Sequence, residues 1–318
     1  WPVPILNGSN SVIDSAWRRF LGSYLFFSFR RDRIAILSFV VLCTFFLASF
    51  SASLLAPFDP YDPIQIDIMD SEIPPVWMEE GDQRFLLGTD AQGRDLLSTI
   101  LYGSRISITI GIFAVLLQAF LGISIGLVSG YFGGRLDNFL MRLADIQLSF
   151  STLMVAIIFL AVFQALFGTE LYEKLAIVML ILVIGIAEWP HYARTVRANV
   201  LAEKKKEYVD AVRVIGLGSL RIMFKHILPN TLSPILVIST VQIANAIVSE
   251  AALSFLGLGM PVTKPSLGSL INSGFEFIFS GSWWITIIPG VVLVVLVLVM
   301  NLLGDFLRDV MNPKLYKD

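Results

Sequence analysis

Apolar residues in this chain collect in long runs that are separated by shorter, charged stretches. Five of the runs reach the roughly 20 residues that a helix needs to cross the hydrocarbon core of a bilayer. They cover residues 34–56, 106–132, 146–169, 227–249 and 277–304. A sixth run, 175–187, is long enough only if it continues through Glu188 to Ala193, which places one carboxylate near a membrane face, where it is tolerated. The pattern predicts an all-α integral membrane protein with six transmembrane helices.

Composition agrees with this pattern. Hydrophobic residues make up 56% of the chain and charged residues 15%, and the mean hydropathy is +0.76. These values exclude an ordinary soluble domain. The single cysteine, Cys43, lies inside the first apolar run, so we expect neither a disulfide framework nor a cysteine metal cluster.

The basic residues are distributed unevenly over the predicted topology. If the N-terminus is cytoplasmic and six helices alternate, all but five of the 23 lysines and arginines lie on the inner side. The exceptions are Arg84, Arg94, Arg105, Lys174 and Lys264. Because positive charge favours the cytoplasmic side, the multi-pass chain is expected to have both termini in the cytoplasm.

The helices and charges divide the chain into regions. These are a cytoplasmic N-terminal lead (1–33), a first transmembrane helix (34–56), an extracytoplasmic segment (57–102), a five-helix core (103–304) and a cytoplasmic tail (305–318). Within the core, residues 203–230 form a polar insert between two apolar runs. The predicted topology places this insert in the cytoplasm.

The insert has a helical repeat with one apolar face. Apolar or aromatic residues recur at i, i+3, i+4 and i+7, at Tyr208, Ala211, Val212 and Ile215. Gly216 is expected to end this helix, and a second short amphipathic run ends at Pro229. The insert is therefore predicted to be a helix–turn–helix elbow that offers a docking surface to a soluble protein.

A polar stripe lies within the fifth predicted helix. Its members fall within an arc of about 120° at about 100° per residue, and they are Ser239, Gln242, Asn245 and Ser249. Polar groups inside a membrane must meet other polar groups or a water-filled cavity. Two interpretations stay open: hydrogen bonds between helices, or the lining of a translocation pathway.

Glycines recur every four residues in the second predicted helix, at 122, 126 and 130. Small residues at this spacing let a neighbouring helix approach closely. That neighbour belongs either to this chain or to another subunit.

Motifs for catalysis and nucleotide binding are missing from the sequence. It contains no Gly-x4-Gly-Lys-Ser/Thr loop and no Gly-x-Ser-x-Gly elbow. His191 and His226 have no cysteine or acidic partner at metal-ligand spacing. The basic Lys204-Lys205-Lys206 segment beside a membrane helix is interpreted as a topology anchor and not as a nucleic-acid site. We therefore expect no catalytic residue, bound cofactor or metal, and uphill transport would need energy from a partner.

Several segments resemble one protein family. Asp210-Ala211-Val212, followed after three residues by Gly216 and later by Leu228-Pro229, resembles the "EAA" loop of bacterial ABC importer permeases. Four further segments resemble the dipeptide/oligopeptide/nickel class of these permeases: 85–90 with 93–95, 102–105, 254–259 and 301–305. The long segment after the first helix is similar to the "C"-type subunits of that class.

The resemblance implies a type I ABC importer permease fold in a bacterial inner membrane. The implied partners are a homologous second permease, two ABC ATPases that hold Mg-ATP, and an extracytoplasmic solute-binding protein, besides membrane lipid. Substrates of the class include dipeptides, longer peptides, glutathione, nickel chelates, opines and some sugars. This chain would then be a non-catalytic subunit with a cytoplasmic coupling elbow.

The resemblance also implies roles for individual residues. The ATPase-coupling residues would be Tyr208, Asp210, Ala211, Gly216 and Leu217. Asp210 replaces the glutamate that is usual in the family, which keeps the charge on a shorter side chain. The outer-loop residues Asp90, Arg94 and Asp95 either contact the binding protein or form internal ion pairs.

Three other functions make different demands on the sequence. A stand-alone proton-coupled secondary carrier would need intramembrane titratable groups or matched half-repeats. An export or assembly scaffold would not need the outer-loop segments, and a membrane enzyme would need a catalytic constellation. The sequence favours the importer permease over all three.

Overall fold

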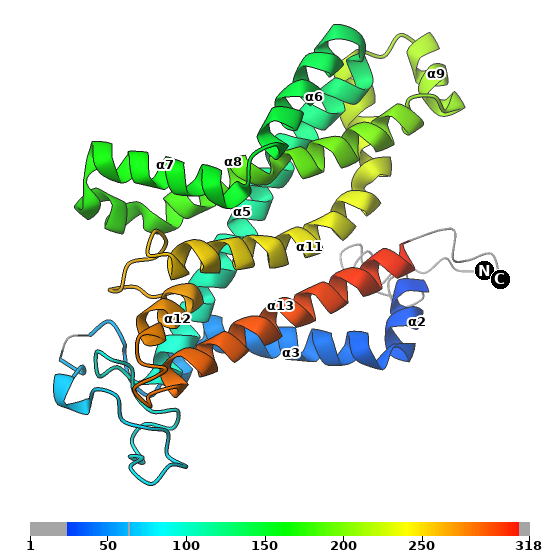
Figure 1. The fold of residues 1–318 in the computed structure, drawn as a ribbon. Coiled ribbons are helices and arrows are strands. Elements are labelled where there is room, and N and C mark those ends of the chain that lie inside the picture. The colour runs from blue at the N-terminus through cyan, green and yellow to red at the C-terminus, as the bar shows by residue number, and fades with distance from the viewer. Residues whose placement is uncertain (1–23, 63, 312–318) are drawn as a thin grey trace, which may run out of the picture.

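The computed structural model describes residues 24–62 and 64–311, and these are helical apart from loops and one isolated bridge between Thr89 and Asp95. Figure 1 shows the arrangement. The elements are α2 (Tyr24–Arg31), α3 (Arg33–Phe50), α4 (Ala52–Leu55), η1 (Ile68–Asp70), α5 (Leu96–Phe132), α6 (Gly134–Leu148), α7 (Thr152–Phe167), α8 (Thr169–Glu203), α9 (Glu207–Val214), α10 (Ser219–Ile222), the π-helical η2 (Met223–Ile227), α11 (Leu228–Phe255), α12 (Leu267–Phe275) and α13 (Trp284–Val310).

Four helical stretches in the described part of the chain are long and apolar enough to cross a membrane. They are Arg33–Phe50, Leu96–Phe132, Ser219–Phe255 and Trp284–Val310. The pair α6 and α7 makes a fifth if the two count as one broken span. The remaining predicted helix lies within α8, which carries charged residues toward both of its ends. The all-α membrane fold is confirmed, and the exact count of six stays a prediction.

The helix pair α5–α8 forms the centre of the structure, and the glycine repeat explains how closely it packs. A Cβ atom on Gly122 would lie 2.3 Å from Cβ of Tyr192, and one on Gly126 would lie 2.6 Å from the carbonyl oxygen of Ala193. One on Gly130 would lie 2.8 Å from Cβ of Val200. The neighbour that the repeat admits is therefore a helix of the same chain.

The third predicted helix, 146–169, is not straight. It corresponds to the end of α6 and the whole of α7, which meet at an angle of 84°. The backbone N–H of Ser149 closes the last turn of α6 on carbonyls of that turn, and Ser151 has an extended backbone. Serines that offer local hydrogen bonds compete with the helical ladder, so the helix breaks here although its hydropathy is continuous.

Polar bonds tie the ends of α5, α6 and α8 together. Asp137 of α6 accepts hydrogen bonds from Ser129 of α5 and from Arg197 of α8, the latter at 2.6 and 2.7 Å. At the end of α8, Nζ of Lys204 donates to the carbonyl oxygen of Gly130 at 2.8 Å. These bonds fix the direction in which α8 delivers the chain to the polar insert.

Candidate functional site

The polar insert forms the predicted elbow, and its sharp turn depends on one glycine. Helix α9 ends at Val214 with Ile215 as its C-cap, and Gly216 follows with a φ of +84°. The N–H of Gly216 donates to the carbonyl of Arg213, and the N–H of Leu217 donates to that of Val212. This is the double hydrogen bond of a Schellman motif, in which the left-handed position favours glycine. Val212 and Leu217 both pack against the main hydrophobic core.

Tyr208 fastens the base of the elbow to the two long helices on either side. Its hydroxyl donates to the carboxylate of Glu203 at 2.8 Å and accepts from Nδ2 of Asn230 at 3.0 Å. Burial, and next the hydrogen bond to Glu203, raise the pKa of Tyr208. Val209 beside it is completely buried. The first turn of α9 is thus fixed to the end of α8 and the start of α11.

The tip of the elbow exposes apolar side chains. Val214 is 87% exposed, Ile215 74% and Leu220 68%. We call these three residues the elbow tip. Asp210 and Ala211 are also exposed, and Asp210 accepts a hydrogen bond from Arg213 at 3.1 Å. Sequence analysis placed Ile215 on the same apolar face as Tyr208 and did not single out Val214 or Leu220.

Replacing Tyr208 by phenylalanine is expected to loosen the elbow, because the hydroxyl is lost while the aromatic ring stays packed. The loss of two hydrogen bonds, one of them to a carboxylate, costs about 1–2 kcal/mol, which raises local opening about five- to thirtyfold. Limited trypsin digestion at Lys204–Lys206 measures this opening. Tyr131→Phe is the matched control, since within the described residues Tyr131 forms a hydrogen bond to a side chain only through its backbone carbonyl. Equal cleavage rates in the two variants would contradict the anchoring role.

The polar stripe of α11 is divided between helix contacts and open surface. Ser239 accepts a hydrogen bond from the hydroxyl of Tyr192 at 2.9 Å, and Gln242 is buried and donates to Gln118 of α5 at 3.4 Å. Asn245 donates to Gln242 at 3.0 Å but is exposed, and Ser249 is half-buried. Bonds between helices therefore use the inner half of the stripe, and its other half is open in this chain.

Glu188 adds a carboxylate beside the broken pair α6–α7. It accepts a hydrogen bond from Thr152 of α7 at 2.5 Å and lies 3.2 Å from Nε2 of His191, and its side chain is 14% exposed. Sequence analysis treated Glu188 only as a charge that the membrane must tolerate. The one sequence signal that could have singled out Glu188 was its position inside an apolar run.

The outer-loop residues are buried within the segment before α5. Asp90 and Arg94 form an ion pair at 2.7 Å, and Arg94 also donates to the carbonyl of Val262 at 2.9 Å. Asp95 caps α5 by accepting from the N–H of Ser98 at 2.8 Å, and burial raises its pKa against these hydrogen bonds. Of the two alternatives, internal ion pairs or contact with the binding protein, the geometry fits internal ion pairs. A binding protein at this face would contact the residues around them.

Two family models match the chain. The model described as "Binding-protein-dependent transport system inner membrane component" matches residues 122–317. The model described as "N-terminal TM domain of oligopeptide transport permease C" matches residues 11–75. Together they cover the elbow, the polar stripe and the first helix of the described structure.

Curated relatives match over nearly their whole length. The dipeptide transport system permease protein DppC of Haemophilus influenzae is 39% identical over 91% of this chain and 93% of its own. The di/tripeptide transport system permease protein DppC of Pseudomonas aeruginosa is 38% identical over 87% of this chain and 85% of its own.

A solved structure shares the fold. An inward-facing crystal form of the MetNI methionine ABC transporter superposes with a TM-score of 0.53 at 18% identity, over 67% of this chain and 96% of that one. At this identity the likeness concerns the fold alone, and it agrees with the type I permease arrangement expected from the sequence. The family model matches more than half of this chain. The chain therefore belongs to the binding-protein-dependent transport system inner membrane components.

Proposed function

We propose that this chain is the permease subunit of an ATP-driven importer of dipeptides or other short peptides, and that it forms half of the translocation pathway. The observation that carries this proposal is the elbow tip, an apolar surface on an elbow whose base is bonded to both α8 and α11. The substrate class is taken from the relatives, which are dipeptide and di/tripeptide transport permeases.

The elbow is built to pass movement into the membrane helices. Tyr208 and Val209 fix α9 to the long helices, and α9 lies past the end of α8 (Figure 1). Helix α8 packs on α5 through the glycine repeat, so the two move together. An ATPase that closes on nucleotide would displace the elbow and, with it, this helix pair as a rigid body.

The predicted coupling residues take different parts in this arrangement. Asp210 and Ala211 are exposed beside the tip, and Gly216 sets the turn. Tyr208 and Leu217 face inward and hold the elbow in shape. The surface that enters the ATPase is accordingly assigned to the elbow tip with Asp210 and Ala211.

The open half of the polar stripe is assigned to the translocation pathway. Asn245 is exposed and Ser249 is half-buried, whereas Ser239 and Gln242 hold α11 to α8 and α5. A polar surface that remains open in a membrane-spanning helix needs water or a polar partner opposite. A facing permease subunit would complete that surface.

The proposed assembly has one further permease of the same family, two ABC ATPases with Mg-ATP and an extracytoplasmic binding protein. We assign no nucleotide site and no catalytic group to the chain itself. The basic residues around the elbow and at the start of α3 support an inner-membrane orientation with cytoplasmic ends. The N- and C-terminal residues themselves lie outside the described part of the chain. Family membership favours this assembly over a stand-alone proton-coupled carrier.

Gentle extraction of the tagged protein, followed by mass spectrometry of the associated proteins, tests the proposal. The expected result is two ATPase subunits, a second permease and a solute-binding protein. The binding protein is then screened against dipeptides, longer peptides and nickel chelates. A chain that emerges alone or as a homo-oligomer would overturn the assembly, and a binding protein that ignores peptides would overturn the substrate class.

A charge at the elbow tip is expected to prevent ATPase binding. In Ile215→Asp, an apolar side chain that would be desolvated on docking becomes an unpaired carboxylate, which is costly to bury. We expect at least about tenfold less co-purified ATPase, which corresponds to about 1.4 kcal/mol. Ser219→Asp is the matched control, because it adds the same charge to the elbow at the favourable start of α10 without removing apolar surface. ATPase recovery that is equal in both variants would rule out docking through the tip.

A further inference from the structure

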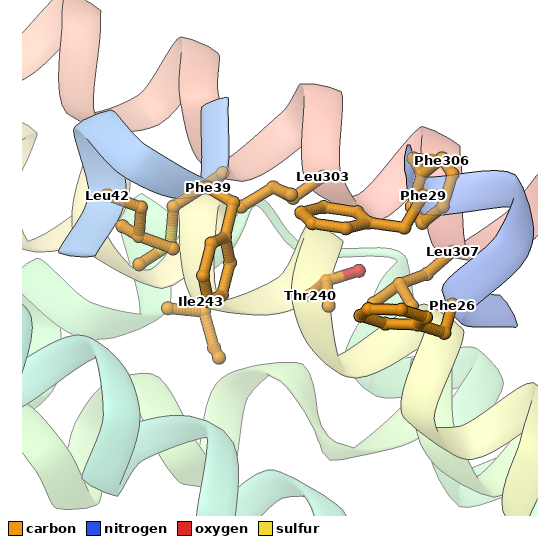
Figure 2. Close-up of a pocket in the computed structure, with 10 residues that line it drawn as sticks. Phe26, Phe29, Phe39, Leu42, Thr240, Ile243, Leu303, Phe306 and Leu307 are labelled. Carbon is orange, nitrogen blue, oxygen red and sulfur yellow. The ribbon is translucent and has the colours of Figure 1, made fainter. Parts of the chain in front are cut away.

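A cavity of about 470 Å³ lies between α2, α3, α11 and α13, and its lining residues are distinct from those of the elbow and the stripe. Figure 2 shows the aromatic and aliphatic side chains that line it, among them Phe26 and Phe29 of α2, Phe39 of α3, Ile243 of α11 and Leu303 of α13. Its volume lies within the range of about 300–1,000 Å³ that is typical of ligand sites.

No polar atom of the lining is available to a ligand. Thr240 is the one residue of the lining with a side-chain oxygen, and its hydroxyl donates to the carbonyl of Val237 in its own helix at 2.8 Å. Binding sites for water-soluble molecules place a few polar groups to orient the ligand. The lining therefore fits a purely hydrocarbon group, and three of the surrounding helices, α3, α11 and α13, belong to stretches that are long and apolar enough to cross a membrane.

Aromatic contacts build the wall of the cavity formed by α2. The ring of Phe29 meets that of Phe39 at 5.6 Å and that of Phe306 at 5.7 Å, both edge to face. These contacts fix α2 across the ends of α3 and α13. Phe39 remains 48% exposed, so the cavity reaches the surface of the chain.

The wall formed by α2 ends in basic residues. Arg30 lies four residues after Phe26 and therefore on the same helical face, and Arg31 and Arg33 follow it. All three are exposed. The carboxylate of Asp32, which lies between them, accepts hydrogen bonds from the N–H groups of Ile34 and Ala35 as the cap of α3. Helix α2 thus combines an apolar face on the cavity with cations at one end, the pattern of a helix in a membrane interface.

We propose that this cavity binds one acyl chain of an anionic phospholipid, whose phosphate pairs with Arg30. The apolar lining accepts the hydrocarbon chain, since an unfilled space would forfeit dispersion contacts along its walls. The basic end of α2 distinguishes an anionic headgroup from a zwitterionic one, as juxtamembrane arginines do at the cytoplasmic leaflet. The site does not depend on the transported solute.

Photolabelling of the complete transporter in lipid vesicles tests the site. The probes are phosphatidylglycerol and phosphatidylcholine that carry a diazirine on one acyl chain, and labelled peptides are mapped by mass spectrometry. We expect labels on α2, α3 and the end of α13 at the cavity, with more labelling from phosphatidylglycerol. Absence of label there would overturn the proposal.

Two pairs of variants separate the acyl chain from the headgroup. Leu303→Trp fills the cavity and should lower labelling about tenfold, or about 1.4 kcal/mol, whereas Leu298→Trp on the exposed face of α13 should not. Arg30→Gln should remove the preference for phosphatidylglycerol. Arg31→Gln should keep it, because that guanidinium lies over the ring of Phe27, which does not line the cavity. Unchanged labelling in Leu303→Trp would overturn the acyl site, and an unchanged preference in Arg30→Gln would overturn the headgroup assignment. Neither result depends on peptide transport, so failure of the proposed function would be seen separately.

Discussion

Gly126→Leu is expected to abolish accumulation of the folded protein in the membrane. A Cβ atom at this position would lie 2.6 Å from the carbonyl oxygen of Ala193 and 2.8 Å from Cβ of Val196. Neither atom can swing away, because one belongs to the backbone of α8 and the other is fixed to it. Small overpacking costs about 1–3 kcal/mol, and a leucine places four carbon atoms between two helices that form the centre of the fold. Immunoblots of the membrane fraction and size-exclusion profiles after extraction measure the loss.

Gly290→Leu provides the control for this substitution. Gly290 lies inside α13, and a Cβ atom there would meet nothing within 4 Å. Replacement should leave the amount of folded chain unchanged, and it removes a residue of poor helix propensity. Gly126→Ala should be intermediate, since it adds the Cβ alone. If Gly126→Leu accumulated as well as Gly290→Leu, the close packing of α5 on α8 would be wrong.

The glycine repeat illustrates how far sequence alone could lead. Spacing at 122, 126 and 130 predicted that a helix comes close, because small residues are what permits this in a membrane. The spacing could not identify the partner helix, because the face of α8 that packs against these glycines carries Tyr192, Val196 and other residues without a distinctive pattern. Only the three-dimensional arrangement shows that the partner helix is in the same chain.

Helix ends were predicted less well than helices, for a physical reason. Hydropathy measures preference for lipid, and it placed the start of the second helix at 106, whereas α5 begins at Leu96. The ten extra residues include Ser98 and Thr99, which are buried against protein and bonded to Asp95. A protein environment satisfies polar groups that lipid would not, so a transfer scale starts this helix too late.

The elbow was predicted as a unit, but its apolar residues were assigned to one face. Helical spacing grouped Tyr208 with Ile215, although α9 ends before the spacing is complete. Tyr208 and Val212 turn toward the core, while Ile215 lies at the cap and is exposed. Helical periodicity places these residues on one face only if the helix continues. Because the helix ends before Gly216, Tyr208 and Val212 anchor the elbow and Ile215 belongs to its tip.

Gly216→Val is expected to abolish substrate-stimulated ATP hydrolysis while the transporter still assembles. At a φ of +84° an ordinary residue is strained by about 1–2 kcal/mol, and a β-branched residue fits least well. The chain can relieve this strain by giving up the two hydrogen bonds that close α9 on Gly216 and Leu217. The elbow tip then loses its fixed direction, although its apolar side chains remain. ATPase assays in vesicles with peptide-loaded binding protein compare basal and stimulated rates, and co-purification measures assembly.

Gly216→Asn separates backbone strain from bulk. Asparagine is similar in size to valine but tolerates the left-handed conformation, and it is the usual alternative to glycine at this position of a helix end. A Cβ atom at Gly216 would meet nothing within 4 Å, so neither side chain is excluded by the chain itself. Stimulation should therefore survive in Gly216→Asn. If both variants lost stimulation, bulk against the ATPase would be the cause, and if both kept it, the turn would have no part in coupling. Only loss in valine with retention in asparagine ties coupling to the backbone geometry of this one residue.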